Sequence, residues 1–392
     1  MSLTPTRDEL VQSASKLVPL LRSRALWIDE HRRLPDDVIE AIELSGILKM
    51  QAPKQYGGYE SDAHTLIDVH AEVARGNSSA AFCVSVYALL NWMAGLWPDE
   101  VLDEVFATEN VRVCGTLATT GTATKVDGGY RISGTWRFNS GILHAQWKVT
   151  AAVPDGPEAA EGPITTLIPV SDLEIVDDWY THGLPGSGSV TVTAHDVFVP
   201  SSRIVKTADF FTDQCKSVVN SAKPSYHLTP MLVTSSAATA GQLIGAAKYA
   251  LESFLDRLPG RGISYTHYPS QAEAPITHIR VGEAGLLIEE AEARAHRFAD
   301  LIEEKLVKGE PWTVTERASS RVQLGRVAQL CKQAVDLIAT ISGGSSIFHD
   351  VPITRIQRDV NAVAIHALTN PDTSLELYGR LLCGLEPNTD YL

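Results

Sequence analysis

The chain has 392 residues, of which 44% are hydrophobic and 20% charged, as expected for an ordinary globular protein. Its formal net charge of −14 argues against a nucleic-acid-binding surface, which needs a basic face to neutralise phosphates. No apolar run is long enough to span a membrane, no signal core opens the chain, and the five cysteines are scattered, so we expect a cytoplasmic protein without a membrane span, disulfide framework or metal site.

The first 110 residues are predicted to form helices. The segment 35–48 begins with Pro35 and two acidic residues, which suit a helix N-terminus, and continues with apolar residues at helical spacing. A second helix is expected over 61–76, with Gly76 as its end. The segment 78–97 is apolar on nearly every side, which predicts a buried helix closed by Pro98.

The pattern changes between residues 111 and 215. In "YRISGTWRF" (130–138) apolar and polar residues alternate, which is the period of a half-buried strand. The turn signal "DGG" precedes it, and further short alternating runs follow. This block is predicted to be a central antiparallel β-barrel or sandwich.

Residues 216–392 are predicted to be helical again. Long helical segments are expected over 228–257, 275–308, 312–342 and 350–368, separated by breaks at "PGRG", "GEP" and "GGSS" and ended by Pro371. Four long helices with short connections predict an up-and-down four-helix bundle. The fold class is therefore α+β, with domains at 1–110, 111–215 and 216–392.

Several common motifs of cofactor and catalytic sites are absent. The sequence contains no GxGxxG after a strand, no Walker loop, no HExxH and no GxSxG, so it has no nicotinamide or ATP site of its own. The glycine-rich segment "GLPGSGS" (183–189) precedes a strand rather than a helix, and turn chemistry alone explains it as a flexible turn.

Four segments in the right order resemble the acyl-CoA dehydrogenase superfamily. They are "YGG" (56–58), "DGGYRISGTWRFNSG" (127–141), "GLPGSGSVTVTAHDVFVP" (183–200) and "GGSSIFHDVPITRIQRD" (343–359). The similarity extends over essentially the whole chain. Within the superfamily, the sequence looks like the two-component, group D type of flavin-dependent monooxygenase.

This resemblance implies a flavin, FMN or FAD, between the strand domain and the bundle. The positions that match cofactor contacts are Gly115, Thr116, Leu117, Ala118, Trp136, Phe138, Asn139, Ser140, Arg261, Gly343, Gly344 and Ser345. Core packing is the alternative interpretation for Trp136 and Phe138. Arg261 matches an arginine that reaches the flavin phosphate from a neighbouring subunit, and an exposed loop arginine is its alternative.

The segment 365–369 separates two possible activities. The commonest dehydrogenases of this family place a glutamate base here, whereas this chain reads "IHALT", with His366. Monooxygenases of the family carry a histidine in this window. The resemblance therefore implies His366 and Ser140 as catalytic residues, although His366 read alone is compatible with a histidine packed between helices.

The expected substrate site lies over the flavin, lined in part by the helix 78–97. The candidate substrate-binding residues are Tyr87, Asn91, Trp92, His144 and His366, and core packing is the alternative for the residues on the helix. Phenol-hydroxylating members often carry a histidine late in this helix, and this chain has Asn91 and Trp92 near that position.

The function implied by the resemblance is a flavin-dependent monooxygenase. It would use O2 and reduced flavin, supplied by a separate NAD(P)H:flavin reductase, to hydroxylate or N-oxidise a small aromatic, polyketide or amino-sugar substrate through a C4a-hydroperoxyflavin. The family also implies a homotetramer. The alternatives are an FAD-dependent acyl-CoA dehydrogenase or oxidase and, from a third class, a flavin-free scaffold protein.

Overall fold

The N-terminal part of the molecule is helical. The computed structural model describes residues 4–211 and 215–392, so the expectations for 1–3 and 212–214 lie outside the described residues. The helices are α1 (Arg7–His31), α2 (Asp36–Ser45), α3 (Ala63–Gly76), α4 (Ser78–Ala94) and α5 (Asp99–Val105). Thr6 and Glu9 form a capping box that fixes the start of α1, and the Asn77 side chain accepts from the Ala80 amide to start α4.

A single seven-stranded sheet follows. Its strands are β1 (Val113–Val126), β2 (Gly129–Trp136), β3 (Trp147–Pro154), β4 (Ile164–Pro169), β5 (Glu174–Val176), β6 (Thr191–Pro200) and β7 (Ile204–Lys206). Their order is β5-β6-β2-β1-β3-β4-β7. In β2, Tyr130, Ile132 and Trp136 are buried while Arg131 is exposed, as the alternation predicts.

The expected antiparallel sheet is corrected at one pair of strands. All neighbours run antiparallel except β1 and β3, which are parallel, with Val113 opposite Trp147. After the β1–β2 hairpin the chain crosses through the short helix η3 (Ile142–His144) and pairs with the other side of β1. That return gives β3 the direction of β1, so the sheet is mixed.

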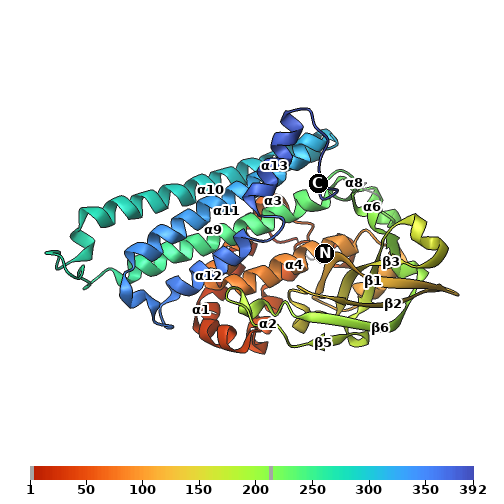
Figure 1. Cartoon of the computed structure of the whole chain (residues 1–392), viewed down its shortest axis with the longest axis horizontal. Helices are drawn as coiled ribbons and strands as arrows, with labels where there is room; N and C mark the ends of the chain where they lie inside the picture. Colours follow the sequence, from red (N-terminus) through yellow and green to blue (C-terminus); the bar gives the residue numbers. More distant parts are fainter. Residues whose placement is uncertain (1–3, 212–214) are drawn as a thin grey trace.

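The C-terminal part forms the long helices. Short helices α6 (Thr207–Phe211), α7 (Val218–Ser221) and α8 (Pro224–His227) lead into α9 (Met231–Arg257), α10 (Pro275–Lys308), α11 (Val314–Ile341), α12 (Pro352–Ala364) and α13 (Pro371–Leu382). The four predicted helical segments correspond to α9–α12, with α13 as an additional helix after Pro371. The bundle extends away from the sheet, which lies beside its other end (Figure 1).

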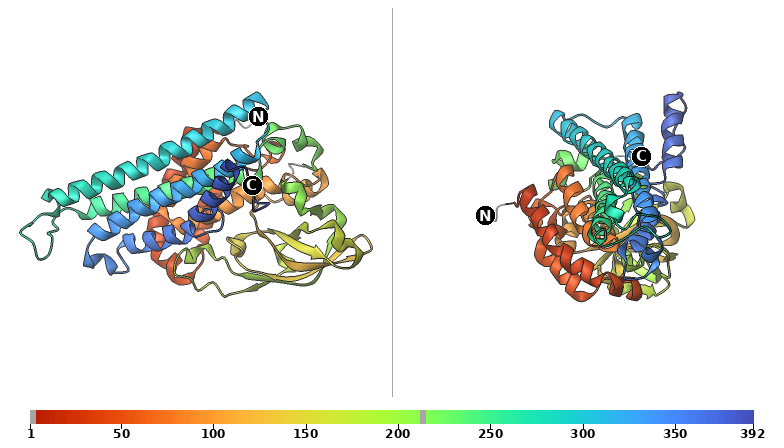
Figure 2. Two further views of the ribbon diagram at one scale, coloured as in Figure 1. Left: turned by 45° about the horizontal axis from the view of Figure 1, so that its top comes forward. Right: turned by 90° about the vertical axis from the view of Figure 1, so that its left-hand side faces the viewer.

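Helix α9 joins the bundle to the N-terminal helices. A Cβ at Gly241 would lie 2.1 Å from the Ile67 carbonyl oxygen, and one at Gly245 would lie 2.0 Å from the Ala71 carbonyl oxygen. These two glycines therefore let α9 and α3 approach each other at backbone distance. The end-on view shows the N-terminal helices lying along one side of the bundle (Figure 2).

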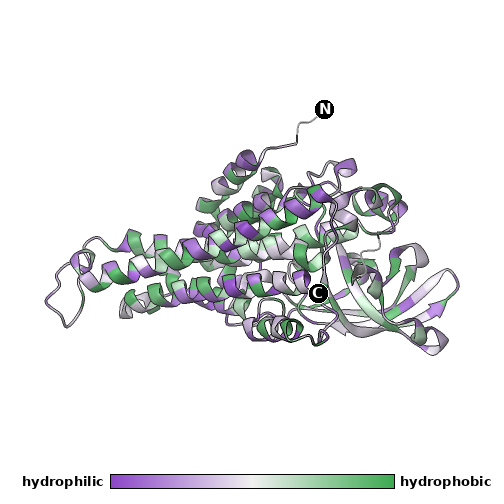
Figure 3. Cartoon of the chain, turned by 90° about the horizontal axis from the view of Figure 1, so that it is seen from above, coloured by the Kyte–Doolittle hydropathy of each residue, from purple (hydrophilic) through white to green (hydrophobic). Residues whose placement is uncertain are grey.

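Hydrophobic and hydrophilic residues alternate along the bundle helices (Figure 3). This is the pattern of helices that bury one face and expose the other to water. Among the described residues, no helix combines the length and the hydropathy of a transmembrane span.

Candidate active site

The glycine-rich segment 183–189 lies against helix α12. A Cβ at Gly183 would be 2.4 Å from the Arg358 carbonyl oxygen, so only glycine permits this contact. The next amide, that of Leu184, donates to Oδ1 of Asp359 at 2.7 Å. Burial raises the pKa of the Asp359 carboxyl to about 7. Two motifs about 175 residues apart thus meet where the sheet and the bundle join.

Ser140 occupies the turn after β2. It is 7% exposed, and its Oγ lies 2.7 Å from the Oγ of Ser189. Ser189 is in turn 2.7 Å from the Oγ of Ser187, which donates to the Leu184 carbonyl oxygen at 2.8 Å. Ser140 therefore belongs to a hydrogen-bonded row of hydroxyls that begins in the segment 183–189.

Phe138 lies two residues before Ser140, in the same turn after β2. It adopts a positive φ of 63°, which is uncommon for an aromatic residue, and it is 62% exposed. The neighbouring Asn139 is fully buried, and its amide donates to the carbonyl oxygens of Trp136 and Val190 at 2.7 and 2.9 Å. The buried amide holds the turn that exposes Phe138, whose ring meets Trp179 edge to face at 5.9 Å between centroids.

Trp136 has a different environment. It is 0% exposed, and its indole nitrogen donates to the Ala151 carbonyl oxygen at 3.0 Å. A Cβ at Gly121 would lie only 2.3 Å from its ring. Trp136 is thus a residue of the sheet's own core, and the structure corrects the expectation that its ring touches a cofactor.

The segment Gly115–Thr120 provides backbone groups near the middle of β1. Gly115 has φ +157°, and a Cβ there would lie 2.1 Å from the Val149 carbonyl oxygen. The pairing of β1 with β3 shifts register between Thr116 and Gly121, and its pairing with β2 begins only at Gly121. Leu117 and Ala118 therefore lie outside both ladders and are partly or fully exposed, where their backbone groups can face a ligand.

His366 lies outside the helix in which it was predicted. Helix α12 ends at Ala364, and the His366 carbonyl oxygen accepts from the amides of Thr369 and Asn370, both at 2.9 Å. Asn370 then caps α13, which begins at Pro371. Because α13 begins at Pro371, the chain must turn between the two helices. Helix α12 is therefore shorter than the predicted helical segment 350–368.

The imidazole of His366 has a defined environment. Its side chain is exposed, yet protein surrounds it closely enough that desolvation lowers its pKa. Nδ1 accepts from the Leu368 amide at 3.3 Å, so the neutral ring carries its hydrogen on Nε2. The ring of Phe82 on α4 meets it edge-on at 6.4 Å between centroids.

Arg261 lies with the loop 343–345 at the other end of α12. Its Nη2 donates to the Ser342 carbonyl oxygen at 2.6 Å and to Ser345 Oγ at 3.2 Å, while Arg257 reaches the same hydroxyl at 3.5 Å. Burial, followed by the nearby Arg257, lowers the pKa of Arg261, and its Nη1 is buried without a hydrogen-bond partner among the described residues. Gly343 has φ +68° beside this guanidinium, and Gly344 starts the short helix η9.

The Arg261 cluster and His366 lie beyond opposite ends of α12. Helix α12 has 13 residues, and its length of about 20 Å lies between the loop 343–345 and His366. The candidate cofactor residues therefore form two groups, one beside the sheet and one at the far end of the bundle.

Comparison with known proteins identifies the family. Residues 4–97 match the model for the acyl-CoA dehydrogenase N-terminal domain, and residues 237–371 match that for its C-terminal domain. A pigment production hydroxylase of Rhodococcus sp. is 30% identical over 382 residues, which cover 97% of each protein. The chain belongs to the acyl-CoA dehydrogenase superfamily.

Other relatives place it in the superfamily's flavin-dependent monooxygenase branch. The oxygenase component of the FADH(2)-dependent resorcinol hydroxylase of Rhizobium sp. is 29% identical over 99% of this chain and 97% of its own length. The structure of XiaF from Streptomyces sp., solved with FADH2 and glycerol, superposes with a TM-score of 0.91 at 28% identity, covering 98% of this chain and 97% of that one. The acyl-CoA-dehydrogenase-like fold and the enzyme class predicted from the sequence are confirmed.

The residues beside the sheet fit a flavin. Phe138 offers an exposed ring for a flat conjugated group, and Ser140 offers a hydroxyl at the turn next to it. Leu117 and Ala118 add backbone groups that the sheet does not use. Trp179 joins them through its contact with Phe138, and no motif in the sequence marks this residue.

Three predicted substrate residues on α4 are buried. Tyr87, Asn91 and Trp92 are 1%, 1% and 5% exposed. The Tyr87 hydroxyl donates to the Gly141 carbonyl oxygen at 2.7 Å, and the ring of Trp92 stacks on Tyr226 at 5.7 Å between centroids. In this monooxygenase-like chain they pack the helix, which corrects the expectation that they contact a substrate.

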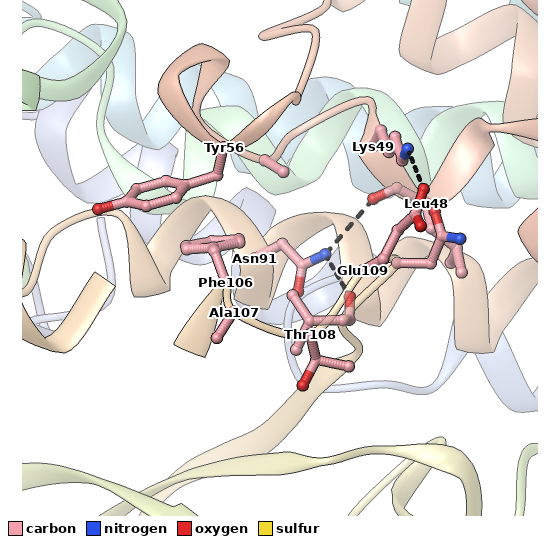
Figure 4. A pocket seen from close by; sticks show the side chains of 11 residues that line it. Leu48, Lys49, Tyr56, Asn91, Phe106, Ala107, Thr108 and Glu109 are labelled. Carbon is pink, nitrogen blue, oxygen red and sulfur yellow. Dashed lines mark hydrogen bonds and ion pairs between the residues drawn. The ribbon is translucent and has the colours of Figure 1, made fainter. Parts of the chain in front are cut away.

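Asn91 borders a pocket away from the flavin-site residues. The pocket has a volume of about 240 Å³ and is lined by Leu48, Lys49, Ala52, Tyr56, Asn91, Phe106, Ala107, Thr108, Glu109, Asn110 and Val111. The Asn91 amide nitrogen points to the carbonyl oxygens of Leu48 and Val111 (Figure 4), and its oxygen accepts from the Val113 amide at 3.1 Å. The side chain joins α4 to β1, and both its amide nitrogen and its amide oxygen are engaged in hydrogen bonds to the backbone.

His144 faces the N-terminal helices instead of the flavin-site residues. Burial, together with the charges of Arg33 and Arg112, lowers its pKa to about 4. Its carbonyl oxygen accepts from the Arg112 Nε at 2.5 Å. The structure does not bring His144 together with His366.

The sequence did not predict which face of α4 is partly exposed. Phe82, Val86 and Leu89 follow one another at helical spacing and are the partly exposed apolar residues of this buried helix. Phe82 contacts the His366 ring, while Val86 and Leu89 pack against a cluster that also holds Leu117. The helical period of 78–97 contained this signal, but an apolar helix does not say which of its faces is left uncovered.

Proposed function

We propose that this flavin-dependent monooxygenase hydroxylates an aromatic, phenol-type substrate, with FADH2 received from a separate reductase. The neutral Nε2–H of His366 beside the apolar Phe82 is the observation that carries the proposal. An aromatic ring would pack on the face formed by Phe82, Val86 and Leu89, with its hydroxyl directed to His366. Relatives named as hydroxylases of resorcinol and of p-hydroxyphenylacetate support this substrate class.

The chain's own residues have distinct roles in this proposal. Reduced flavin, when bound, supplies the electrons that activate O2. Phe138 packs against the ring, and the backbone of Leu117 and Ala118 with the Ser140 hydroxyl orients it. His366 donates from Nε2 to an oxygen of the substrate or of the activated oxygen, and its lowered pKa keeps it neutral near pH 7.

The dehydrogenase alternative lacks its base. No Asp or Glu lies in 365–369. Asp372 and Glu376, the carboxylates of helix α13, are both exposed, and Glu376 accepts from the Asn388 amide at 3.0 Å. A proton-abstracting carboxylate is therefore missing at the position that the commonest dehydrogenases use, and bleaching of flavin-loaded protein by an acyl-CoA would favour that alternative.

We also propose that the Arg257–Arg261 cluster binds the flavin diphosphate of a second chain in a homotetramer. The roughly 20 Å length of α12 lies between this cluster and His366 of the same chain, and two guanidinium groups suit phosphate oxygens. Because FMN lacks the second phosphate, Arg261→Ala should weaken binding of FADH2 more than that of FMNH2. Equal weakening would contradict this role, and light scattering measures the oligomeric state.

The main test is anaerobic mixing of protein, FADH2 and a phenol panel, followed by O2 in a stopped-flow cell. A transient absorbing species between the reduced and oxidised spectra, together with a product heavier by one oxygen atom, is expected. His366→Ala should lower product yield at least about tenfold while FADH2 affinity changes less than about twofold. His195→Ala, on the exposed edge of β6, is the matched control. An unchanged yield in His366→Ala would remove His366 from the mechanism.

A further inference from the structure

Ser140, Ser189 and Ser187 form a continuous row of buried hydroxyls. Their exposed fractions are 7%, 3% and 1%, and both Oγ–Oγ distances are 2.7 Å. The row ends on the Leu184 carbonyl oxygen, to which Ser187 donates at 2.8 Å. Ser140 is the member at the other end, in the turn that exposes the Phe138 ring.

The end of the row determines the direction of every hydrogen bond in it. A serine hydroxyl has one hydrogen and can accept through its lone pairs. Because Ser187 gives its hydrogen to the Leu184 carbonyl oxygen, Ser189 must donate to Ser187. Ser140 must then donate to Ser189, which leaves only lone pairs on the outer side of the Ser140 oxygen.

The Leu184 carbonyl oxygen, which is the anchor of the row, is held rigidly. Leu184 adopts φ +53°, its amide donates to the buried Asp359 carboxyl, and its carbonyl oxygen also accepts from Trp179 Nε1 at 3.1 Å. The Ser187 amide donates to the same carbonyl oxygen at 3.1 Å. A carbonyl fixed from several sides keeps its position, so the polarity of the row is built into the fold.

We propose that Ser187 and Ser189 are positioning residues that hold Ser140 as a hydrogen-bond acceptor, so that the site selects the reduced flavin. This inference rests on the proposed function, in which the Ser140 hydroxyl orients the flavin ring, and it takes N5 as the ring atom that this hydroxyl meets. Reduced flavin carries a hydrogen on N5 and donates it, whereas oxidised flavin has only a lone pair there. An outward-facing acceptor therefore bonds the reduced form and opposes two lone pairs in the oxidised form.

Flavin affinities measured in both redox states test the proposal. The wild-type protein should bind FADH2 tighter than FAD, and Ser189→Ala should reduce that preference by about five- to tenfold, because Ser140 is then free to turn its hydrogen outward. A tenfold loss corresponds to a fall of 29.6 mV in the two-electron potential of the bound flavin. Ser187→Ala should give a smaller change of the same sign, since Ser189 remains as a partner.

Two further variants separate polarity from packing. Ser189→Thr keeps a hydroxyl and should restore the preference. Ser253→Ala removes another buried serine, whose hydroxyl donates within α9, and should leave the ratio unchanged. A wild-type preference that Ser189→Ala leaves intact would overturn the role of the row while the monooxygenase function stands. A wild-type protein that binds no FADH2 would overturn both.

Discussion

The carboxyl of Asp359 is the buried acid that connects the bundle to the segment 183–189. It is 3% exposed and accepts from the Leu184 amide at 2.7 Å. Burial, its largest effect, raises the pKa from 3.8 to about 7. The Asp359→Asn substitution keeps the shape and an oxygen acceptor for Leu184 but removes the ionisation, so it isolates the effect of charge.

The sign of the expected pH dependence follows from the raised pKa. Between about pH 4 and 7 the folded protein holds a proton that the unfolded chain releases, so the free energy of unfolding falls as the pH rises. A shift from 3.8 to about 7, at about 1.4 kcal/mol per unit, sets an upper limit of about 4 kcal/mol. Relative to wild type, Asp359→Asn should therefore gain stability as the pH rises from 5 to 8.

Urea unfolding at pH 5, 6, 7 and 8 measures this difference. The Asp359→Asn midpoint should already lie above the wild-type midpoint at pH 5, and the gap between them should widen up to pH 8. Asp359→Ala also removes the acceptor of the Leu184 amide, and it should lower stability by about 1–3 kcal/mol relative to Asp359→Asn at every pH. Wild-type and Asp359→Asn midpoints that change in parallel with pH would refute the reasoning.

Two other substitutions test the site. Gly115→Ala would place a Cβ 2.1 Å from the Val149 carbonyl oxygen, so it should destabilise the protein by about 2–4 kcal/mol and weaken flavin binding, as chemical denaturation and flavin titration would measure. Tyr87→Phe removes one of the two hydrogen bonds that the Gly141 carbonyl oxygen accepts, the other coming from the His144 amide at 3.1 Å, and should cost about 0.5–1.5 kcal/mol of stability with an unchanged KM for substrate; a raised KM would return Tyr87 to the substrate site.

The order of helices and strands was predictable because periodicity is a local property. The alternation in 130–138 marks β2, and Gly309 ends α10 with the positive φ of 67° that its position after the helix suggests. The parallel β1–β3 pair was not predictable in the same way, because strand direction depends on where the chain returns after the hairpin. Neither strand carries a local mark of its neighbour.

The site was predictable where a motif fixes backbone conformation. The stretch "WRFNSG" places Phe138 and Ser140 beside each other because the buried Asn139 amide holds the turn between them. Burial of Trp136 could not be decided, because an alternating strand shows which residues share a face but not which face is covered. The same limit applied to α4, whose uncovered face is the one with Phe82 rather than Tyr87.

The direction of the hydrogen bonds in the serine row cannot be predicted from any single segment of the sequence. Ser140 and Ser189 are neighbours because Trp136 pairs with Val192 near the ends of the antiparallel strands β2 and β6. The anchor depends on α12, whose Asp359 holds Leu184. A substitution at Asp359 that moves Leu184 should therefore change the redox preference at Ser140 without contacting the flavin. Only the assembled fold connects those residues, so the chemistry of Ser140 follows from the packing of the bundle on the sheet.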